Sequence, residues 1–112
     1  MEDIFALREI NVNGSLDLSE SNVTDISPLE NYNNINFLDL NNTKISSVES
    51  LKNTDIGILY LKFNDIPNLF EELKDFKSNK ISIHVSTGML SDEQIDELQK
   101  QHVNWSIIVS DY

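Results

Sequence analysis

The tripeptide Leu16-Asp17-Leu18 decides the fold, because similar tripeptides follow it at nearly constant intervals. The later copies are Leu38-Asp39-Leu40, Leu59-Tyr60-Leu61 and Ile81-Ser82-Ile83, and their first residues lie 22, 21 and 22 positions apart. Such a repeat indicates units that each form one supersecondary element and bury their apolar face only against neighbouring units. The spacing therefore predicts a stacked solenoid.

Further apolar residues recur at fixed positions after each tripeptide. Counted from the first leucine, they stand at +7, +10 and +13 in the first two copies, whereas the third copy has the polar Glu72 at its last position. These residues are Val23, Ile26 and Leu29, then Ile45, Val48 and Leu51, then Ile66 and Leu69.

The second and third copies resemble the LxxLxLxxNxI consensus of leucine-rich repeats. They read Ile35-Asn-Phe-Leu38-Asp-Leu40-Asn-Asn-Thr43-Lys-Ile45 and Ile56-Gly-Ile-Leu59-Tyr-Leu61-Lys-Phe-Asn64-Asp-Ile66. The segment 23–29 resembles the convex side of the short bacterial, internalin-like class, and the resemblance covers roughly residues 13 to 86. The family's ladder asparagine corresponds here to Ser21, Thr43, Asn64 and Ser86, and hydroxyls serve the same backbone groups more weakly. Ser78 and Gly88 miss their apolar positions, so the fourth copy looks degenerate.

The expected fold class is α/β: a short leucine-rich-repeat solenoid with about five parallel strands on its concave face. Its convex side should carry 3-10 turns and helices, and its C-terminal cap should be βαβ-like. We expect a single domain over residues 1–112, with an N-terminal cap over 1–14, repeats over 15–86 and a helix–strand cap over 87–112. Asn13-Gly14 favours a hairpin in the N-terminal cap, although the same residues also suit a loop.

The C-terminal third shows helix and strand signals of its own. Leu69, Phe70, Leu73 and Phe76 have helical spacing within residues 68–77, and a strand over 80–85 should follow. Ser91 and Gln94 match a capping box for a helix reaching about Gln101. A last strand over 103–109, parallel to the others, would place Val103, Trp105 and Ile107 toward the core.

Strand side chains alternate, so residues between the core leucines should point to the concave face. The repeat places them in three rows, and a shift of one residue would invert them. The central row is Asp17, Asp39, Tyr60, Ser82 and Ser106; the flanking rows are Ser15, Phe37, Ile58, Lys80 and Asn104, and Ser19, Asn41, Lys62, His84 and Ile108.

A partner-binding site is expected on these rows. Asp17 and Asp39 should lie about 4.8 Å apart on adjacent strands, and this like-charge pair costs the fold about 0.2–1 kcal/mol. A cationic partner would benefit from it, and aromatic groups beside it would serve as anchors. The alternative is that the N-terminal segment covers Phe37 and Ile58 and that both carboxylates are solvated. The predicted partner-binding residues are Asp17, Phe37, Asp39, Asn41, Ile58, Tyr60, Lys62, Ser82 and His84.

Composition narrows the class of partner. Nineteen acidic residues against eight basic ones give a net charge of −11, which disfavours nucleic acid and anionic membrane and favours a basic protein. No secretory signal or long apolar run is present, so a cytoplasmic protein is expected. The chain has no cysteine, and His84 and His102 are interpreted as polar surface residues, so we expect no metal, no cofactor and no enzymatic activity.

The resemblance implies protein binding through the concave face. Size and charge add the hypothesis of a stoichiometric inhibitor, namely a bacterial immunity protein or antitoxin that neutralises a basic toxin such as a nuclease. It would be a monomer, or a heterodimer with its partner. Two alternatives stay open. One is an adaptor or adhesion module of a larger surface protein, and the other is a small enzyme or a regulatory phosphoacceptor domain using Ser82, Ser86 or Thr87.

Overall fold

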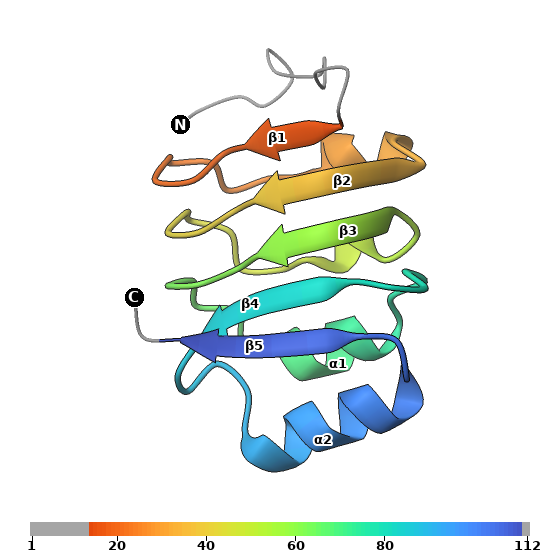
Figure 1. Cartoon of the computed structure of the whole chain (residues 1–112). Helices are drawn as coiled ribbons and strands as arrows, with labels where there is room; N and C mark the ends of the chain where they lie inside the picture. Colours follow the sequence, from red (N-terminus) through yellow and green to blue (C-terminus); the bar gives the residue numbers. More distant parts are fainter. Residues whose placement is uncertain (1–13, 111–112) are drawn as a thin grey trace.

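The computed structural model describes residues 14–110, the side chains at 28 and 31 excepted. They form an α/β fold with one sheet of five parallel strands, arranged in the order of the sequence (Figure 1). The predicted hairpin around Asn13-Gly14 lies outside the described residues. The strands are β1 (Ser15–Asp17), β2 (Asn34–Asp39), β3 (Asp55–Tyr60), β4 (Ser82–Ser86) and β5 (Ser106–Ser110).

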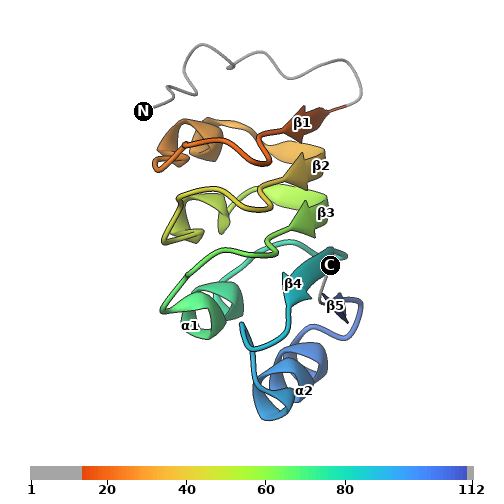
Figure 2. The ribbon, with the colours of Figure 1, turned by 90° about the vertical axis from the view of Figure 1, so that its left-hand side faces the viewer.

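The return segments between the strands all lie on one side of the sheet (Figure 2). The first two contain the 3-10 helices η2 (Ser27–Asn31) and η3 (Glu49–Leu51). The next two contain the α-helices α1 (Leu69–Lys74) and α2 (Asp92–Gln101). The predicted helices are therefore confirmed, the first of them shorter than expected, and α2 begins with the predicted capping box of Ser91 and Gln94.

A single apolar cluster fills the space between the sheet and the return segments. The paired leucines at positions 38, 40, 59 and 61 and the apolar residues at +7, +10 and +13 are buried there, as their spacing predicts. The buried residues of the return segments include Val23, Ile26, Leu29, Ile45, Val48, Leu51, Ile66 and Leu69.

The predicted register is correct from β1 to β3 and between β4 and β5, but wrong between β3 and β4. Leu59 pairs with Ile83 rather than Ile81, so the last two intervals are 24 residues each. The interval that contains α1 is longer by two or three residues than the intervals of 22 and 21 residues that contain the 3-10 helices. A shift of two residues keeps every side chain on its predicted face but moves it along the strand. The corrected rows are Asp17, Asp39, Tyr60, His84 and Ile108; Ser15, Phe37, Ile58, Ser82 and Ser106; and Ser19, Asn41, Lys62, Ser86 and Ser110.

The last strand also begins later than predicted. Val103 lies in the turn after α2 and is 80% exposed, so its predicted place in the core is wrong. Trp105 is buried, as predicted, and its indole N–H donates to the carbonyl of Ser78 at 2.9 Å. Its ring contacts Phe76 edge-on at a centroid distance of 6.3 Å.

Polar side chains form a ladder just after the first three strands. Ser21 and Thr43 donate to the carbonyls of Leu18 and Leu40, at 2.6 and 3.2 Å. The Asn64 amide donates to Leu40 and Leu61, at 2.7 and 3.0 Å, and so joins two neighbouring turns. Ser86 does not continue this ladder, because the corrected register places Gly88 at that position.

The residue before each of these three ladder residues has a left-handed backbone. The φ angles are 56° for Glu20, 54° for Asn42 and 64° for Phe63. The N–H groups of Glu20 and Asn42 each donate to the next turn, at the carbonyls of Asn41 and Lys62. The same tight turn thus recurs after β1, β2 and β3.

A second ladder lies ahead of the strands, and in the corrected register Ser78 takes the position of Thr54 and not the predicted apolar position. The Thr54 hydroxyl donates to the carbonyl of Tyr32 at 3.0 Å, and the Ser78 hydroxyl donates to that of Thr54 at 3.1 Å. Ser78 also accepts the backbone N–H of Ile56 at 3.0 Å. Both hydroxyl residues are buried, so Ser78 satisfies buried backbone groups that an apolar side chain would leave unpaired.

Candidate functional site

The face of the sheet opposite the helices is the candidate site, and no described helix or strand covers it (Figure 2). We call the three corrected rows of side chains on this side the open face. Alternation along the strands places Phe37 and Asp39 here and buries Leu38 and Leu40. All nine predicted partner-binding residues belong to the open face: Asp17, Phe37, Asp39, Asn41, Ile58, Tyr60, Lys62, Ser82 and His84.

The two aspartates are direct neighbours across β1 and β2, as the repeat predicts. Asp17 is exposed, and its Oδ1 accepts the backbone N–H and the hydroxyl of Ser19 at 2.9 and 2.6 Å. These donors lower the pKa of Asp17. Asp39 is half-buried, and its Oδ1 accepts the backbone N–H of Asn41 at 3.0 Å.

Asp39 has the opposite pKa shift from its neighbour. Burial raises the pKa of the Asp39 carboxyl, and the charge of Asp17 adds to that increase. The Asn41 N–H and the more distant Lys62 ammonium oppose it. The two carboxylates lie on the same side of the sheet, on directly paired residues.

Aromatic rings continue the open face across β2, β3 and β4. Phe37 and Tyr60 meet edge to face at a centroid distance of 5.3 Å, and Tyr60 lies 4.3 Å from the ring of His84. The predicted rows placed Ser82 beside Tyr60; in the corrected register His84 takes that place and Ser82 lies beside Ile58. Burial, and then the charge of Lys62, lower the pKa of His84, which favours the neutral imidazole.

The row after the strands is polar and partly structural. Asn41 accepts the backbone N–H of Lys62 through its side-chain oxygen at 2.8 Å, which links the ends of β2 and β3. The Lys62 ammonium lies 3.3 Å from the hydroxyl of Ser110. The open face thus changes in character from strand to strand. The carboxylates lie on β1 and β2, and the aromatic rings lie across β2, β3 and β4. Hydroxyl groups lie toward β5, where the Lys62 ammonium reaches Ser110.

This arrangement is suited to binding a cationic side chain. The paired oxygens of Asp17 and Asp39 can accept charge-assisted hydrogen bonds from a guanidinium or ammonium group. The rings of Phe37 and Tyr60 offer aromatic surface beside the carboxylates for the same group. Within the described chain, no group of three or more His, Cys, Asp or Glu side chains is placed to hold a metal ion.

His102 differs from its predicted role as a polar surface residue. Its ring stacks on Trp105 at 3.8 Å with an angle of 9° between the planes. Its Nε2 is buried and has no hydrogen-bond partner among the described residues. His102 lies at the end of α2, away from the open face, and closes the core around Trp105.

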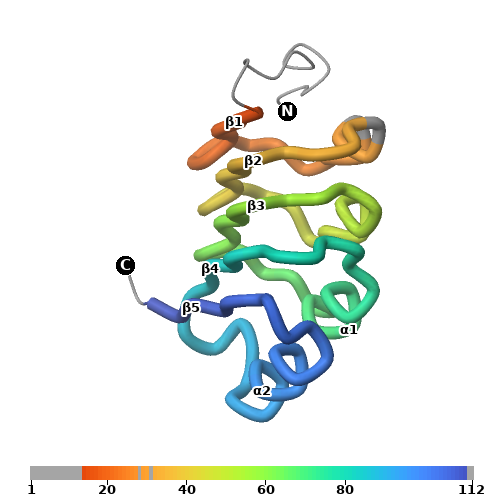
Figure 3. The backbone as a smooth tube through the Cα atoms, turned by 45° about the vertical axis from the view of Figure 1, so that its right-hand side comes forward, coloured from red at the N-terminus to blue at the C-terminus, as the bar shows by residue number. Residues whose placement is uncertain are grey.

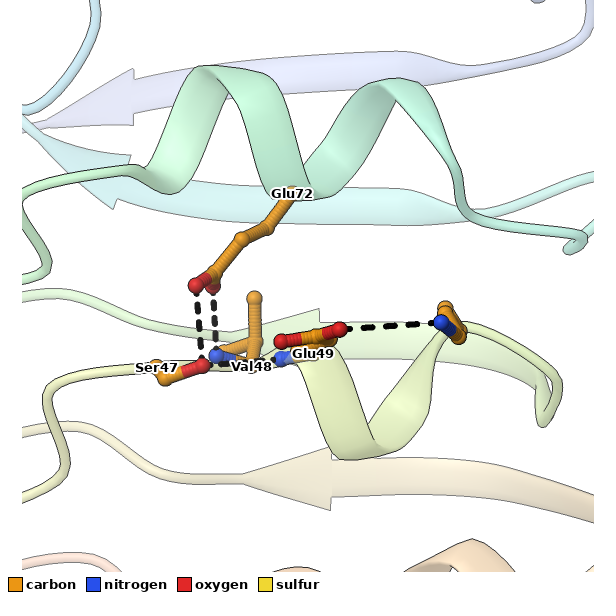
Figure 4. A network of polar contacts seen from close by, with 5 residues as sticks. Ser47, Val48, Glu49 and Glu72 are labelled. Atoms are coloured by element: carbon orange, nitrogen blue, oxygen red, sulfur yellow. Dashed lines mark hydrogen bonds and ion pairs between the residues drawn. The ribbon is translucent and has the colours of Figure 1, made fainter.

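Glu72 is a second residue whose role the sequence pattern does not reveal. Its carboxylate accepts the backbone N–H of Val48 at 2.7 Å and the hydroxyl of Ser47 at 2.8 Å (Figure 4). Ser47 in turn accepts the N–H of Glu49 at 3.2 Å. Glu72 therefore ties α1 to the start of η3 on the helical side of the sheet, and its role is structural.

No described helix is both long and apolar enough to cross a membrane. Comparisons of the chain with protein-family models, with curated proteins and with solved structures give no match in any of the three. The open face therefore has to be interpreted from its own geometry.

Proposed function

We propose that this chain is a leucine-rich-repeat solenoid of the short bacterial, internalin-like class, and that its open face is the concave, protein-binding face. Three recurring features support the proposal. The parallel strands follow one another in sequence order, a side-chain ladder caps the carbonyls of Leu18, Leu40 and Leu61, and a left-handed residue precedes each ladder residue. Leucine-rich repeats present their strands as a binding surface.

The observation that carries the functional proposal is the pairing of Asp17 with Asp39 beside the Phe37–Tyr60 contact. Two carboxylates on adjacent strands repel each other, and burial of Asp39 adds to the cost. A guanidinium group would relieve this repulsion by donating hydrogen bonds to both carboxylates at once and by packing on the neighbouring rings. The expected partner therefore inserts an arginine, or a lysine, at this end of the open face.

The whole-molecule charge supports a basic protein as that partner. A net charge of −11 accelerates encounter with a cationic surface, and the buried rings would then slow dissociation. A small acidic module of this kind suits a cytoplasmic immunity protein or antitoxin. It would occupy the cationic active-site cleft of a toxin, such as a nuclease, in a one-to-one complex without chemistry of its own.

Charge reversal tests the proposal. A toxin-like protein encoded beside this chain should be purified and titrated calorimetrically with the wild type and with the Asp17→Lys, Asp39→Lys double variant. We expect the double variant to lose about 2–5 kcal/mol of binding free energy, because a partner cation would meet like charges. The control is the Glu93→Lys, Glu97→Lys double variant on α2, where both side chains are exposed and net charge changes equally.

Two results would count against the proposal. Equal losses in both double variants would show that only net charge matters, and unchanged affinity in the Asp17 and Asp39 variant would remove the open face from the interface. Inhibition is tested by adding one equivalent of the chain to the active partner. Tight binding that leaves the partner's activity intact would favour the adaptor module instead.

A further inference from the structure

The outer edge of β5 is unusual for the end of a sheet. β5 is the last strand of the stack and pairs with β4 on one side, and no described strand lies on its other side (Figure 3). Its sequence, Ser106-Ile107-Ile108-Val109-Ser110, contains no charge, proline or glycine. Ile108 and Val109 are 42% and 43% exposed. Proteins commonly protect such an edge with charges, prolines or bulges, and β5 has none of them.

The hydrogen bonds between β4 and β5 determine which backbone groups of β5 point outward from the sheet. The N–H of Ser106 donates to Ile81 at 2.9 Å, so the backbone groups of residues 106, 108 and 110 point toward β4. In a strand the direction alternates, so the N–H and C=O groups of Ile107 and Val109 point away from the sheet. The edge therefore offers two donors and two acceptors.

We propose that this edge binds a second copy of the chain through an antiparallel pairing of β5 with β5. The strand has the same side-chain pattern in both directions: serine, aliphatic, isoleucine, aliphatic, serine. A two-fold axis through Ile108 places Ile107 opposite the partner's Val109, and Val109 opposite the partner's Ile107. Each of these pairs exchanges two backbone hydrogen bonds, because both members point their groups outward.

The register follows from the same symmetry. Ile108 faces the partner's Ile108 in a non-hydrogen-bonded pair, where opposed Cα atoms approach to about 4.5 Å. The axis stands perpendicular to the joined sheet, so both open faces look the same way and the two β1 ends lie farthest apart. The carboxylates of Asp17 and Asp39 thus stay remote from those of the partner, and the contact itself is uncharged. This dimer is independent of the partner binding proposed above.

Sedimentation of the full chain over a series of concentrations tests the dimer. The wild type should shift from monomer to dimer as concentration rises, and added salt should strengthen the dimer by screening the negative charge of both copies. Val109→Pro removes an outward N–H without touching the β4 pairing, so it should raise the dissociation constant at least about 10-fold. The control, Val109→Ala, keeps that N–H and should retain most of the dimer.

A cysteine variant tests the register directly. The chain has no cysteine, so Ile108→Cys introduces the only thiol, and it lies on the proposed axis. Under mild oxidation it should form a disulfide-linked dimer far faster than Phe63→Cys, whose parent side chain is 49% exposed in the turn after β3. A wild type that stays monomeric at every concentration would overturn the proposal, and so would equal cross-linking of both cysteine variants.

Discussion

Asp39 shows how a single residue of the open face makes the stability of the fold depend on pH. Burial raises the pKa of its carboxyl above the ordinary value of 3.8, with a further increase from Asp17. A raised pKa means that the folded state holds the proton more tightly than the unfolded state does. Asp39 therefore lowers the stability of the fold once the pH rises through its folded pKa, and has no such effect well below 3.8.

We expect Asp39→Asn to raise the free energy of unfolding near neutral pH by about 0.2–1 kcal/mol, because it removes a half-buried charge that also lies opposite Asp17. The asparagine oxygen can still accept the N–H of Asn41. Urea unfolding near neutral pH and at about pH 3 measures the effect, which should vanish in acid, where the aspartate is already protonated. The counterpart Asp17→Asn should give no such gain, because donors from Ser19 lower the pKa of Asp17. A constant gain at both pH values would argue against this origin.

Phe63 has the one bulky side chain among the three left-handed residues, with a φ of 64°. Left-handed backbone costs an ordinary residue about 1–2 kcal/mol, whereas asparagine tolerates it and already occupies the equivalent position at Asn42. Phe63→Asn should therefore stabilise the fold by about 1 kcal/mol in urea unfolding. Phe63→Ala has no polar side chain to hydrogen-bond the local backbone and should bring little gain. If the alanine variant gained as much, removal of exposed apolar surface, and not backbone strain, would be the reason.

For single residues, the sequence predicts which side chains lie on the open face but not which contacts each side chain makes. Alternation is sufficient to place Asp17, Phe37 and Tyr60, because each strand of a one-sided core must turn its apolar side inward. It does not reveal that Ser78 satisfies buried backbone groups or that His102 stacks on Trp105. Those roles depend on partners more than 20 residues away or on packing after a turn, which no local pattern encodes.

Between elements, the link from α1 to η3 depends on the Glu72 carboxylate. Glu72→Ala would leave the backbone N–H of Val48 and the hydroxyl of Ser47 without their acceptor, so we expect a loss of about 1–3 kcal/mol in the free energy of unfolding. The neighbouring Glu71 serves as control, since it makes only an exposed ion pair with Lys74 at 3.6 Å. Glu71→Ala should cost less than about 0.5 kcal/mol. Similar losses in both variants would mean that general helix charge, and not this link, is responsible.

The strands also show where the repeat spacing no longer predicts the register. It predicts β1, β2 and β3 with the correct register, because their links are short and of nearly equal length. It fails at β4, where Ile81-Ser82-Ile83 resembles the earlier tripeptides although Ile83 is the true partner of Leu59. Alternating apolar residues fit equally well in either register, and only the length of the α1 link decides between them.

The whole molecule carries far more negative than positive charge, and this should appear in its response to salt. Its Cα radius of gyration is 13.1 Å, and the Debye length falls to about 10 Å at 0.1 M salt. Repulsion across the molecule is therefore screened at moderate ionic strength. We expect sodium chloride to raise the thermal midpoint by about 4–8 °C for each kcal/mol of repulsion removed.

The same salt should weaken a complex with a basic partner, because it screens the attraction that brings the two together. Thermal unfolding and calorimetric titration over one salt series therefore give trends of opposite sign. A midpoint that falls with added chloride would show that specific ion pairs, rather than net repulsion, dominate the electrostatics of this chain.

The strand order has a consequence for how this protein can change in evolution. Every strand hydrogen-bonds only to the strands directly before and after it in the chain. Duplication of one unit would therefore insert a new strand without rerouting any existing connection. Each such event would widen the open face by one inter-strand distance of about 4.8 Å. The width of this surface is thus adjustable in discrete steps, by gain or loss of whole strand-and-link units and not by redesign of the core.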